Sequence, residues 1–550
     1  MKKSIIYLLV TLYLSTASFG QKKQIASSKT PFVWESANVY FIVTDRFNNG
    51  DKTNDHTFKR NKPTGLLRGF QGGDLRGIIQ KIDEGYFDKL GINVLWMTPV
   101  VEQIHDGVDE GTGFTYGFHG YWTRDWSALD PSVGTKEDLA ELVQKAHAHG
   151  IRIMLDAVIN HTGPVTAEDS VFPNDWVRTS PKCTYQSYDT YINCTLVENL
   201  PDVKTESNEN VELPTFLANK WKKEGRYDKE IASLDAFFKK TGYPRAPKYY
   251  IMKWLSDYIR EYGIDGYRVD TAKHTTEDVW ADFKKVCDQA FAEYKKKNPK
   301  KVLDTNPFFT VGEVYGYTIG AKQQFDFGDK KVNYFQNGFT ALINFDFRNE
   351  AKMNYEDLFA KYASILQTDL KGNTVMNYIS SHDDAWPYDK KREKPLESGT
   401  KLLLAPGISQ VYYGDESARS LDIPGTQGDA TLRSEMNWNA VSTDTTTQQI
   451  LAHWQKLGQF RKRHTAIGAG IHQQIIATPY VFSRSYSKGN YKDKVVIALD
   501  MNPGIKEISV GKTFANGTKV KDAYSGKTSL VKNGKVSITT EFGIVLLEKQ

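Results

Sequence analysis

The chain has 550 residues, of which 40% are hydrophobic and 25% are charged, a composition typical of a large folded protein rather than of one small domain. Its formal net charge is only +5, with lysine and arginine interspersed among acids. Nucleic-acid binding requires a concentrated basic stripe, so we expect no nucleic-acid partner. Aromatic residues make up 13% of the chain. They would fit either a large core or exposed rings that stack on sugars.

The first 20 residues have the pattern of an export signal. Two lysines precede an apolar run over residues 5–14, and the small residues Ser18 and Gly20 lie where a signal peptidase cuts. This run is too short to cross a bilayer, and no later segment of the sequence is long and apolar enough to do so. We therefore expect a signal peptide at 1–20 and a secreted or periplasmic protein without a membrane span.

Eight strand-like apolar runs follow, and amphipathic helical patterns separate most of them. The helical pattern at Lys136–His149, for instance, places its apolar residues on one face. Strands that alternate with helices in this way predict a (β/α)8 TIM barrel. The eight runs are Val39–Val43, Ile92–Met97, Ile151–Val158, Ile264–Val269, Phe308–Val311, Ala341–Phe345, Val375–Ile379 and Gln410–Tyr413.

Two parts of the chain interrupt this alternation. Residues 162–212 are polar and lack a clear helical pattern, which indicates an inserted loop domain after the third strand. From 465 onward the sequence changes to short alternating runs, such as Lys494–Leu499 and Ser529–Thr539, which predict a C-terminal antiparallel β sandwich. The expected domains are the first part of the barrel at 31–161, the inserted domain at 162–212, the second part of the barrel at 213–464, and the sandwich at 465–550.

The chain contains three cysteines. Cys183 and Cys194 flank a short polar loop, and in an oxidising compartment they could form a disulfide, although two free thiols are the alternative. Cys287 falls in a helical pattern, where we expect a buried, unpaired side chain.

Polar residues directly follow four of the predicted strands. The carboxyl ends of barrel strands carry the active site, so these residues should converge on one rim. A single acid there would be an ordinary helix cap or ion-pair partner, but burying several acids together is costly unless function requires it. Cleavage of a glycosidic bond needs two carboxyl groups in different protonation states. The four segments are Asp156–His161, Gly266–Asp270, Val311–Glu313 and Ser380–Asp384.

These segments resemble, in the right order, the four sequence signatures of the alpha-amylase family, glycoside hydrolase family 13. Flanking matches extend the resemblance over residues 37–464, and Thr44–Asp51 is similar to bacterial periplasmic amylases and cyclodextrin glucanotransferases. One departure is Ser381, where the family usually has Asn, and this puts fine specificity in doubt. The flanking matches are Gly120–Asp125, Leu200–Asp202, Pro406–Ile408 and Tyr413–Glu416.

The resemblance implies a role for each residue. Asp270 would be the nucleophile of a retaining double displacement, Glu313 the acid/base, and Asp383 the group that stabilises the oxocarbenium-like sugar. Arg268, two positions from Asp270 on the same strand face, would keep it ionised. The implied substrate-binding residues are Tyr121, His161, Arg268, Lys273, His274 and His382.

The resemblance also implies calcium, which binds six to eight oxygen ligands. One site would use Asn160, Asp202 and the backbone carbonyl of His274, although a lone histidine is more often a core or surface residue. A second would match a loop of cyclodextrin glucanotransferases; the alternative there is an ordinary polar turn. Its implied ligands are Asn49, Asp51, Asn54, Asp55, Gly72 and Asp74.

We therefore expect a monomeric enzyme that hydrolyses alpha-1,4-glucosidic bonds of starch or maltooligosaccharides. One alternative is a glucanotransferase of the same family, whose members usually carry further domains after the sandwich. Another is a catalytically inactive, glucan-binding family member. Such proteins lose acid residues or carry a membrane anchor, whereas this sequence keeps all three acids and has no span.

Overall fold

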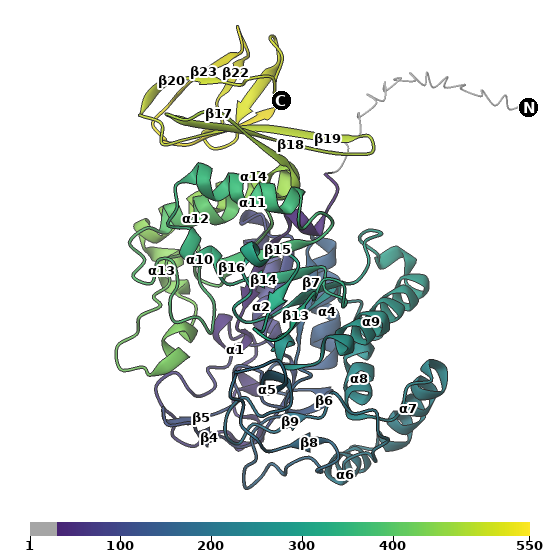
Figure 1. Ribbon diagram of the computed structural model, residues 1–550. Helices are drawn as coiled ribbons and strands as arrows, with labels where there is room; N and C mark the ends of the chain where they lie inside the picture. The colour runs from purple at the N-terminus through teal and green to yellow at the C-terminus, as the bar shows by residue number, and fades with distance from the viewer. Residues whose placement is uncertain (1–29) are drawn as a thin grey trace, which may run out of the picture. The chain divides into compact units, whose positions relative to one another are not determined.

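The computed structural model describes residues 30–550, so the predicted signal peptide lies outside the described residues. Eight parallel strands close into a barrel in the order β1-β16-β15-β14-β11-β10-β7-β2. Each strand overlaps one of the predicted runs, with bounds that differ by up to two residues, and the TIM barrel is confirmed (Figure 1). The strands are β1 (Asn38–Ile42), β2 (Val94–Met97), β7 (Arg152–Ala157), β10 (Gly266–Val269), β11 (Phe309–Gly312), β14 (Ala341–Asn344), β15 (Thr374–Tyr378) and β16 (Ile408–Tyr412).

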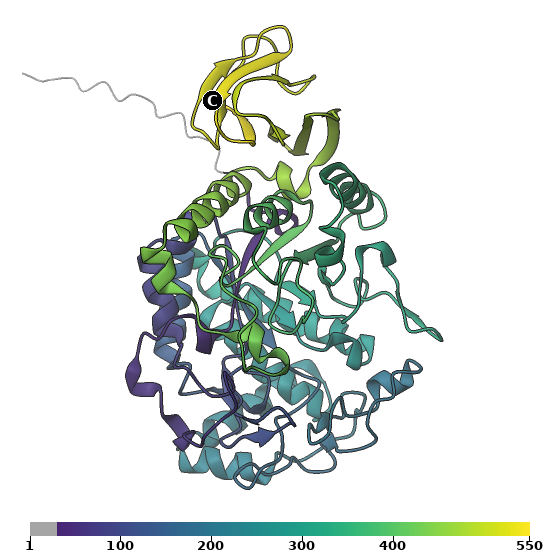
Figure 2. The same ribbon diagram turned by 90° about the vertical axis from the view of Figure 1, so that its left-hand side faces the viewer.

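Every residue of these eight strands is buried, as expected for parallel strands that are covered on both faces. Helices surround the barrel (Figures 1 and 2). Helix α4 begins at a capping box in which Thr135 and Asp138 bond to each other's backbone, and it ends one residue before the predicted boundary. The longer helices are α2 (Leu75–Asp83), α4 (Lys136–Ala148), α8 (Pro247–Tyr262), α9 (Glu277–Lys297), α11 (Tyr355–Gln367), α12 (Pro395–Leu404) and α14 (Thr445–Arg463).

The connections at the carboxyl ends of the strands contain most of the short elements. The predicted insertion at 162–212 contains a two-stranded sheet and one helical turn. These elements are β8 (Val177–Arg178), β9 (Asp202–Val203) and α5 (Asp189–Ile192). Two helices, α6 (Thr215–Lys223) and α7 (Tyr227–Thr241), precede α8. The other strand pairs are β3 (Val101–Gln103) with β6 (Thr123–Leu129), β4 (Val108–Asp109) with β5 (Phe114–Thr115), and β12 (Phe325–Asp326) with β13 (Lys331–Val332).

The remaining helices are short. The α-helical turns are α1 (Thr44–Phe47), α3 (Tyr86–Lys89), α10 (Phe347–Glu350), α13 (Trp438–Thr443) and α15 (Ala466–Ala469). The 3-10 turns are η1 (Trp34–Ser36), η2 (Lys52–Asn54), η3 (Thr57–Lys59), η4 (Ala272–His274), η5 (Pro299–Lys301), η6 (Ile319–Ala321) and η7 (Gly428–Arg433).

The C-terminal part is antiparallel, as predicted. A six-stranded sheet, in the order β17-β18-β19-β24-β21-β22, and the pair β20-β23 enclose a separate apolar core. One prediction was wrong in detail, because Ser529–Thr539 is two strands that belong to different sheets. Asn533 and Gly534, with φ of 51° and 71°, form the turn between them. The strands are β17 (Ile471–Ile476), β18 (Tyr480–Lys488), β19 (Tyr491–Leu499), β20 (Gly504–Ser509), β21 (Lys519–Asp522), β22 (Thr528–Leu530), β23 (Lys535–Thr540) and β24 (Val545–Lys549).

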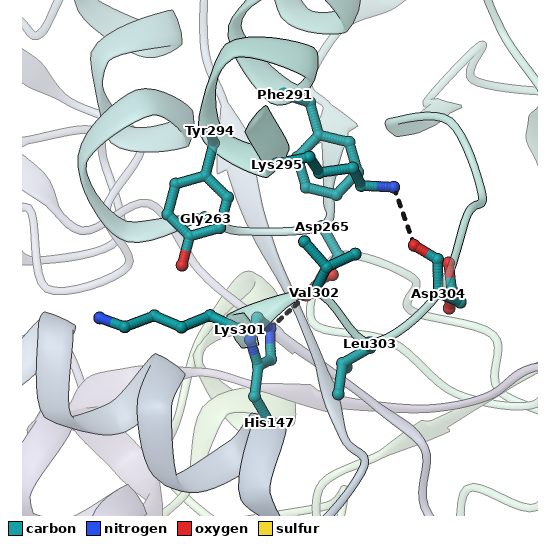
Figure 3. A pocket seen from close by; sticks show the side chains of 10 residues that line it. All are labelled: His147, Gly263, Asp265, Phe291, Tyr294, Lys295, Lys301, Val302, Leu303 and Asp304. Carbon is teal, nitrogen blue, oxygen red and sulfur yellow. Dashed lines mark hydrogen bonds and ion pairs between the residues drawn. The ribbon is translucent and has the colours of Figure 1, made fainter. Parts of the chain in front are cut away.

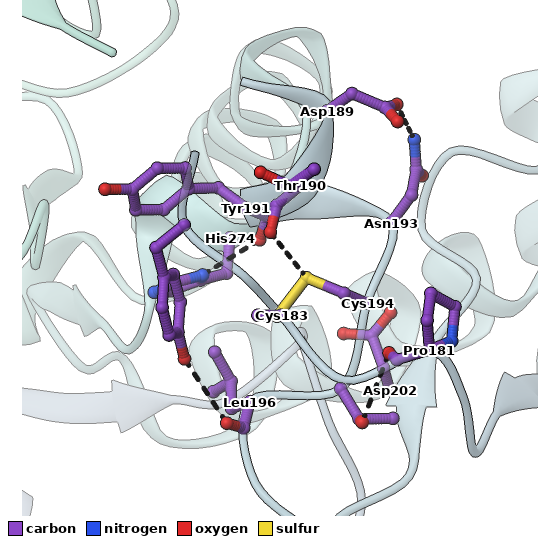
Figure 4. The surroundings of a disulfide bond; sticks show 12 residues. Pro181, Cys183, Asp189, Thr190, Tyr191, Asn193, Cys194, Leu196, Asp202 and His274 are labelled. Atoms are coloured by element: carbon purple, nitrogen blue, oxygen red, sulfur yellow. Dashed lines mark hydrogen bonds between the residues drawn. A yellow bond between two sulfur atoms is a disulfide. The ribbon is translucent and has the colours of Figure 1, made fainter. Parts of the chain in front are cut away.

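Cys183 and Cys194 form a disulfide, so the alternative of two free thiols is wrong (Figure 4). Cys287 is free and buried in α9, as expected. The disulfide closes a polar loop of the inserted segment, which contains α5.

Candidate active site

Two carboxyl groups meet at one arginine where β10 and β11 end. Asp270 directly follows β10 and Glu313 directly follows β11. The backbone N–H of Asp270 donates to the carbonyl of Ala157, and that of Glu313 donates to the carbonyl of Val269, at 3.0 and 2.9 Å. The hydrogen-bonding pattern of the barrel therefore fixes the backbone of both acids.

Arg268 lies between the two acids with a side chain that is 1% exposed. Its Nη1 donates to Oδ1 of Asp270 at 2.7 Å, and its Nη2 lies 2.9 Å from Oε2 of Glu313. The sequence-based prediction that Arg268 holds Asp270 is consistent with this contact. One guanidinium thus contacts both candidate catalytic carboxyls.

Glu313 lies in an environment that favours the protonated form of its carboxyl group. Burial raises the pKa of Glu313 to about 8, and the charges of Asp270 and Asp383 add to this effect, while Arg268 opposes it. The N–H of Thr271 donates to Oε2 at 2.8 Å, from a backbone held at a φ of +48°. A carboxyl group that keeps its proton near neutral pH is suited to act as a general acid.

Asp156, at the end of β7, also belongs to this cluster, although the sequence analysis gave it no role. Arg268 Nη1 donates to its two carboxylate oxygens at 2.9 and 3.0 Å. The hydroxyl of Tyr121 and the indole N–H of Trp96 donate to its Oδ2, at 2.9 and 3.2 Å. Burial raises the pKa of Asp156 to about 7. Asp156 therefore orients Arg268 and Tyr121, which had both been predicted as substrate-binding residues.

The third candidate acid, Asp383, lies after β15 beside His382. Nε2 of His382 is 2.9 Å from Oδ2 of Asp383, and Nη2 of Arg433 donates to Oδ1 at 2.5 Å. The Asp383 side chain is 42% exposed. Partial desolvation acts to raise the pKa of Asp383, but His382, Arg433 and Arg268 together hold this pKa well below its usual range. Arg433, in η7, was missed because no motif in its local sequence marks it.

The two predicted histidines of this region lie on either side of Tyr121. Nε2 of His161 donates to the carbonyl of Tyr121 at 3.2 Å, and the ring of His382 is stacked on that of Tyr121 with centroids 5.3 Å apart. Both histidines are buried, and desolvation lowers the pKa of each. Desolvation therefore favours the neutral form of both imidazoles, and the Asp383 carboxylate opposes this effect at His382.

Lys273 and His274 lie in η4, just after Asp270. Nζ of Lys273 donates to the carbonyl of Tyr315 at 2.9 Å, beside the segment that follows Glu313. Nδ1 of His274 donates to the carbonyl of Tyr191 at 2.9 Å, within the disulfide-closed loop (Figure 4). Both side chains are buried, and these hydrogen bonds hold them in place.

The three residues of the first predicted calcium site lie together. Asn160 accepts a hydrogen bond at its carbonyl from the N–H of Val203 and one at Oδ1 from Thr275, the residue after His274. Both carboxylate oxygens of Asp202 are buried without a hydrogen-bond partner among the described residues. Nε of Arg178 lies 3.0 Å from one of them. A buried carboxylate that accepts no regular hydrogen bond fits a cation ligand, and Arg178 already neutralises part of its negative charge.

The six residues of the second predicted site also cluster. Asp74 accepts from the N–H groups of Gly50 and Asp51 at 3.1 and 2.8 Å, and Nδ2 of Asn49 donates to Asp55 at 2.9 Å. A Cβ on Gly72, whose φ is +86°, would meet Asn49 and Asp55 within 2.5 Å. Of these six residues, two have a side-chain oxygen that is buried without a hydrogen-bond partner within residues 30–550: Asn49 and Asn54. These orphaned acceptors fit a metal ligand set better than a plain polar turn.

A small cavity of about 10 Å³ is lined by residues that include His147, Asp265 and Asp304 (Figure 3). It surrounds Asp265, which precedes β10 and accepts hydrogen bonds from His147 and from the N–H of Ile153 at 2.8 and 2.9 Å. These contacts satisfy Asp265 and join α4 to β7. The cavity therefore belongs to the stabilising face of the barrel rather than to the catalytic one.

Comparison with known proteins decides the family. The family model described as "Alpha amylase, catalytic domain" matches residues 41–420, which include all of the acids described above. The chain belongs to the alpha-amylase family. The glycoside hydrolase class expected from the sequence is thereby confirmed.

Relatives in the alpha-amylase family include both hydrolases and transferases by name. The chain is 36% identical over 527 residues to the periplasmic alpha-amylase of Escherichia coli (strain K12), covering 86% of this chain and 73% of that protein. It is 26% identical over 539 residues to the cyclomaltodextrin glucanotransferase of Thermoanaerobacterium thermosulfurigenes, covering 91% of this chain and 65% of that protein. The solved structure of CldA, described as a cyclomaltodextrin glucanotransferase with a three-domain ABC distribution, is similar in fold, with a TM-score of 0.63 and 20% identity over 94% of this chain and 99% of that one.

Proposed function

We propose that this protein hydrolyses alpha-1,4-glucosidic bonds of starch or maltooligosaccharides with retention of configuration. The observation that supports this most directly is the position of Arg268, which contacts Asp270 at 2.7 Å and Glu313 at 2.9 Å. Two carboxyls within reach of one guanidinium favour the short spacing of a retaining pair, about 5–5.5 Å, over the wider spacing of an inverting one.

In the first step, Asp270 attacks the anomeric carbon while Glu313 donates its proton to the departing glycosidic oxygen. The pKa of about 8 keeps that proton on Glu313 before the reaction. In the second step, Glu313 removes a proton from water, which displaces Asp270 from the covalent glycosyl-enzyme. Asp383, held ionised by Arg433, would bind the hydroxyls of the distorted sugar and the adjacent positive charge of the transition state.

Two substitutions test the roles of the acids. Asp270→Asn should abolish turnover with the fold intact, because the nucleophile is lost but the volume is kept. Glu313→Gln should lower activity on starch by at least about a hundredfold but spare part of the reaction with a glycosyl fluoride, whose leaving group needs little protonation. Asp235→Asn, at an exposed carboxyl on α7, is the matched control. Activity of either catalytic variant above about one hundredth of wild type would contradict the assignment.

Stereochemistry provides an independent test. Proton NMR of the earliest products should detect the alpha anomer first, because two displacements restore the original configuration. Detection of the beta anomer first would exclude the double displacement.

Transglycosylation is the second candidate function. Its support is the similarity to cyclodextrin glucanotransferases, and CldA has the same ABC domain count as expected here, so the number of domains does not separate the two activities. Cyclic or disproportionated glucans from amylose would identify a transferase, whereas linear short products would identify a hydrolase. The presence of all three acids in ordered contacts argues against an inactive binding protein.

We further propose that calcium binds at both predicted sites. Asn160, Asp202 and the carbonyl of His274 would hold one ion, and the second loop, with Asn49, Asp51 and Asn54, would hold the other. A bound Ca²⁺ would supply positive charge to buried oxygens and cross-link segments that are distant in sequence.

For location, we propose the periplasm or the external medium. The N-terminal sequence has the pattern of an export signal, and the Escherichia coli relative is named periplasmic. Within residues 30–550 no helix is both long enough and apolar enough to cross a membrane. We expect the protein to act as a monomer, which the elution volume in gel filtration would check.

A further inference from the structure

Trp386 differs from every other tryptophan of the chain. All 11 tryptophans lie within residues 30–550, and Trp386 is 77% exposed whereas the other ten are buried or half-buried. It follows Asp383 by three positions, on the rim that carries the candidate active site. An indole exposed to this extent gains little from the hydrophobic core, and its apolar face is open to a ligand.

The backbone of Trp386 is held on both sides. Its N–H donates to Oδ1 of Asp384 at 3.0 Å, and its carbonyl accepts from Nη1 of Arg348 at 3.0 Å. Arg348 in turn pairs with Asp384, and the hydroxyl of Tyr378 donates to Asp384 at 2.7 Å. The backbone that carries the exposed ring is therefore held in place by hydrogen bonds to Asp384 and Arg348.

A row of aromatic side chains connects Tyr378, which binds Asp384, to the segment that follows Glu313. The ring of Tyr378 lies 5.9 Å from that of Phe345, and the ring of Phe345 lies 4.9 Å from that of Tyr315. Tyr315 is 54% exposed and follows Glu313 by two positions. Tyr315 follows β11, Phe345 follows β14 and Tyr378 ends β15, and these three strands are neighbours in the barrel. Trp386 and Tyr315 thus belong to one continuous part of the rim.

Arg433 and the Asp384–Arg348 pair lie on opposite sides of Asp383. Arg433 binds Asp383 on one side, from η7, which lies after β16. The Asp384–Arg348 pair, which holds Trp386, lies on the side of β14 and β11, where Glu313 and Lys273 are found. Because Glu313 protonates the departing oxygen in the proposed mechanism, this side of the rim faces the leaving group.

We propose that Trp386 is a stacking platform for a glucose ring on the leaving-group side of the cleft, beyond the bond that is cut. This inference rests on the proposed function. The apolar C–H face of a glucose unit would lie on the exposed indole. The same surface would bind the acceptor sugar when transfer competes with hydrolysis, since the acceptor attacks from where the leaving group departed. Trp386 would therefore determine how strongly longer chains bind and how often the glycosyl group passes to sugar rather than water.

The experiment compares substrates that do and do not occupy this platform. In Trp386→Ala, kcat/KM for maltoheptaose should fall by about tenfold, mostly through KM, which corresponds to the loss of one stacked ring. With maltotriosyl fluoride, which has no sugar on the leaving-group side, the loss should stay below about twofold. With added maltose as acceptor, the ratio of transfer to hydrolysis should fall as well. Trp386→Phe should recover most of each effect, and Phe542→Ala, at an exposed ring in the C-terminal part, is the control.

Equal losses on both substrates, or no loss on maltoheptaose, would overturn the proposal. Fluorescence quenching separates this result from a failure of the proposed function. Acrylamide should quench the exposed Trp386 in the inactive Asp270→Asn protein, and maltoheptaose should protect it. If the wild-type protein does not cleave maltoheptaose, the proposed function fails, but protection from quenching would still support the platform. The absence of protection would refute it.

Discussion

Nη2 of Arg433 lies 2.5 Å from Oδ1 of Asp383, although 50 positions separate the two residues in the chain. Nε of the same guanidinium donates to the carbonyl of His382 at 3.0 Å, and its Nη2 also pairs with Asp429 at 2.6 Å. Arg433 is buried, whereas the Asp383 side chain is 42% exposed. A fixed, buried cation thus orients a carboxylate that is open to substrate.

This contact predicts that Arg433→Gln will lower kcat/KM while the protein still folds. A hydrogen bond to a charged group contributes about 1.5–3 kcal/mol, so kcat/KM on maltoheptaose should fall roughly tenfold to a hundredfold. Arg245→Gln, which removes an exposed ion pair between the α7–α8 connection and Asp235 of α7, is the control. If Arg433→Gln retains wild-type kcat/KM, then Asp383 does not depend on Arg433 for its orientation.

The sequence predicted the eight strands and the three acids because both leave local signals. Parallel strands are apolar runs, and the acids directly follow them. Asp156 was not assigned a role because its partners, Arg268 and Tyr121, come from other strands and loops. Arg433 was missed for a related reason, since only tertiary packing brings η7 to Asp383. The split of Ser529–Thr539 into two strands depended on the Asn533–Gly534 turn, which alternation alone does not reveal.

The raised pKa of Glu313 predicts a pH-dependent cost in stability. Burial raises this pKa from 4.5 to about 8, so between these pH values the folded protein holds a proton that the unfolded chain releases. The free energy of unfolding therefore falls as pH rises through this window. Glu313→Gln removes the titration, so its Tm should exceed that of wild type by roughly 1–3 °C near pH 8 and by less near pH 5. A Tm difference that does not grow with pH would contradict the buried, protonated state of Glu313.

If calcium binds at both proposed sites, a substitution at either site should remove one calcium ion and leave the other bound. Wild type should retain about two equivalents of calcium after gel filtration, and Asp51→Ala and Asp202→Asn should each retain about one, given their oxygen-rich ligand sets. Addition of a chelator should lower the Tm of wild type more than that of either variant, because each ion binds only the folded state. Asp326→Ala, at an exposed carboxyl of the β12–β13 hairpin, is the control. Equal calcium content in wild type and Asp51→Ala would refute the second site alone.

The disulfide provides the last prediction, because the loop that it closes contacts the candidate site. The carbonyl of Tyr191, within this loop, accepts a hydrogen bond from His274 at 2.9 Å (Figure 4). Replacing Cys183 and Cys194 together by serine removes a cross-link between residues 11 positions apart, which should lower the free energy of unfolding by about 2–3 kcal/mol through loop entropy. Because His274 also supplies a proposed calcium ligand, the same variant should lose calcium from the Asp202 site more readily than wild type. Dithiothreitol is the matched control, since it should lower the Tm and the calcium retention of wild type but leave the double variant unchanged. If the reductant affects both proteins equally, its effect does not come from this disulfide. If the double variant retains calcium as well as wild type does, the loop does not support the Asp202 site through His274.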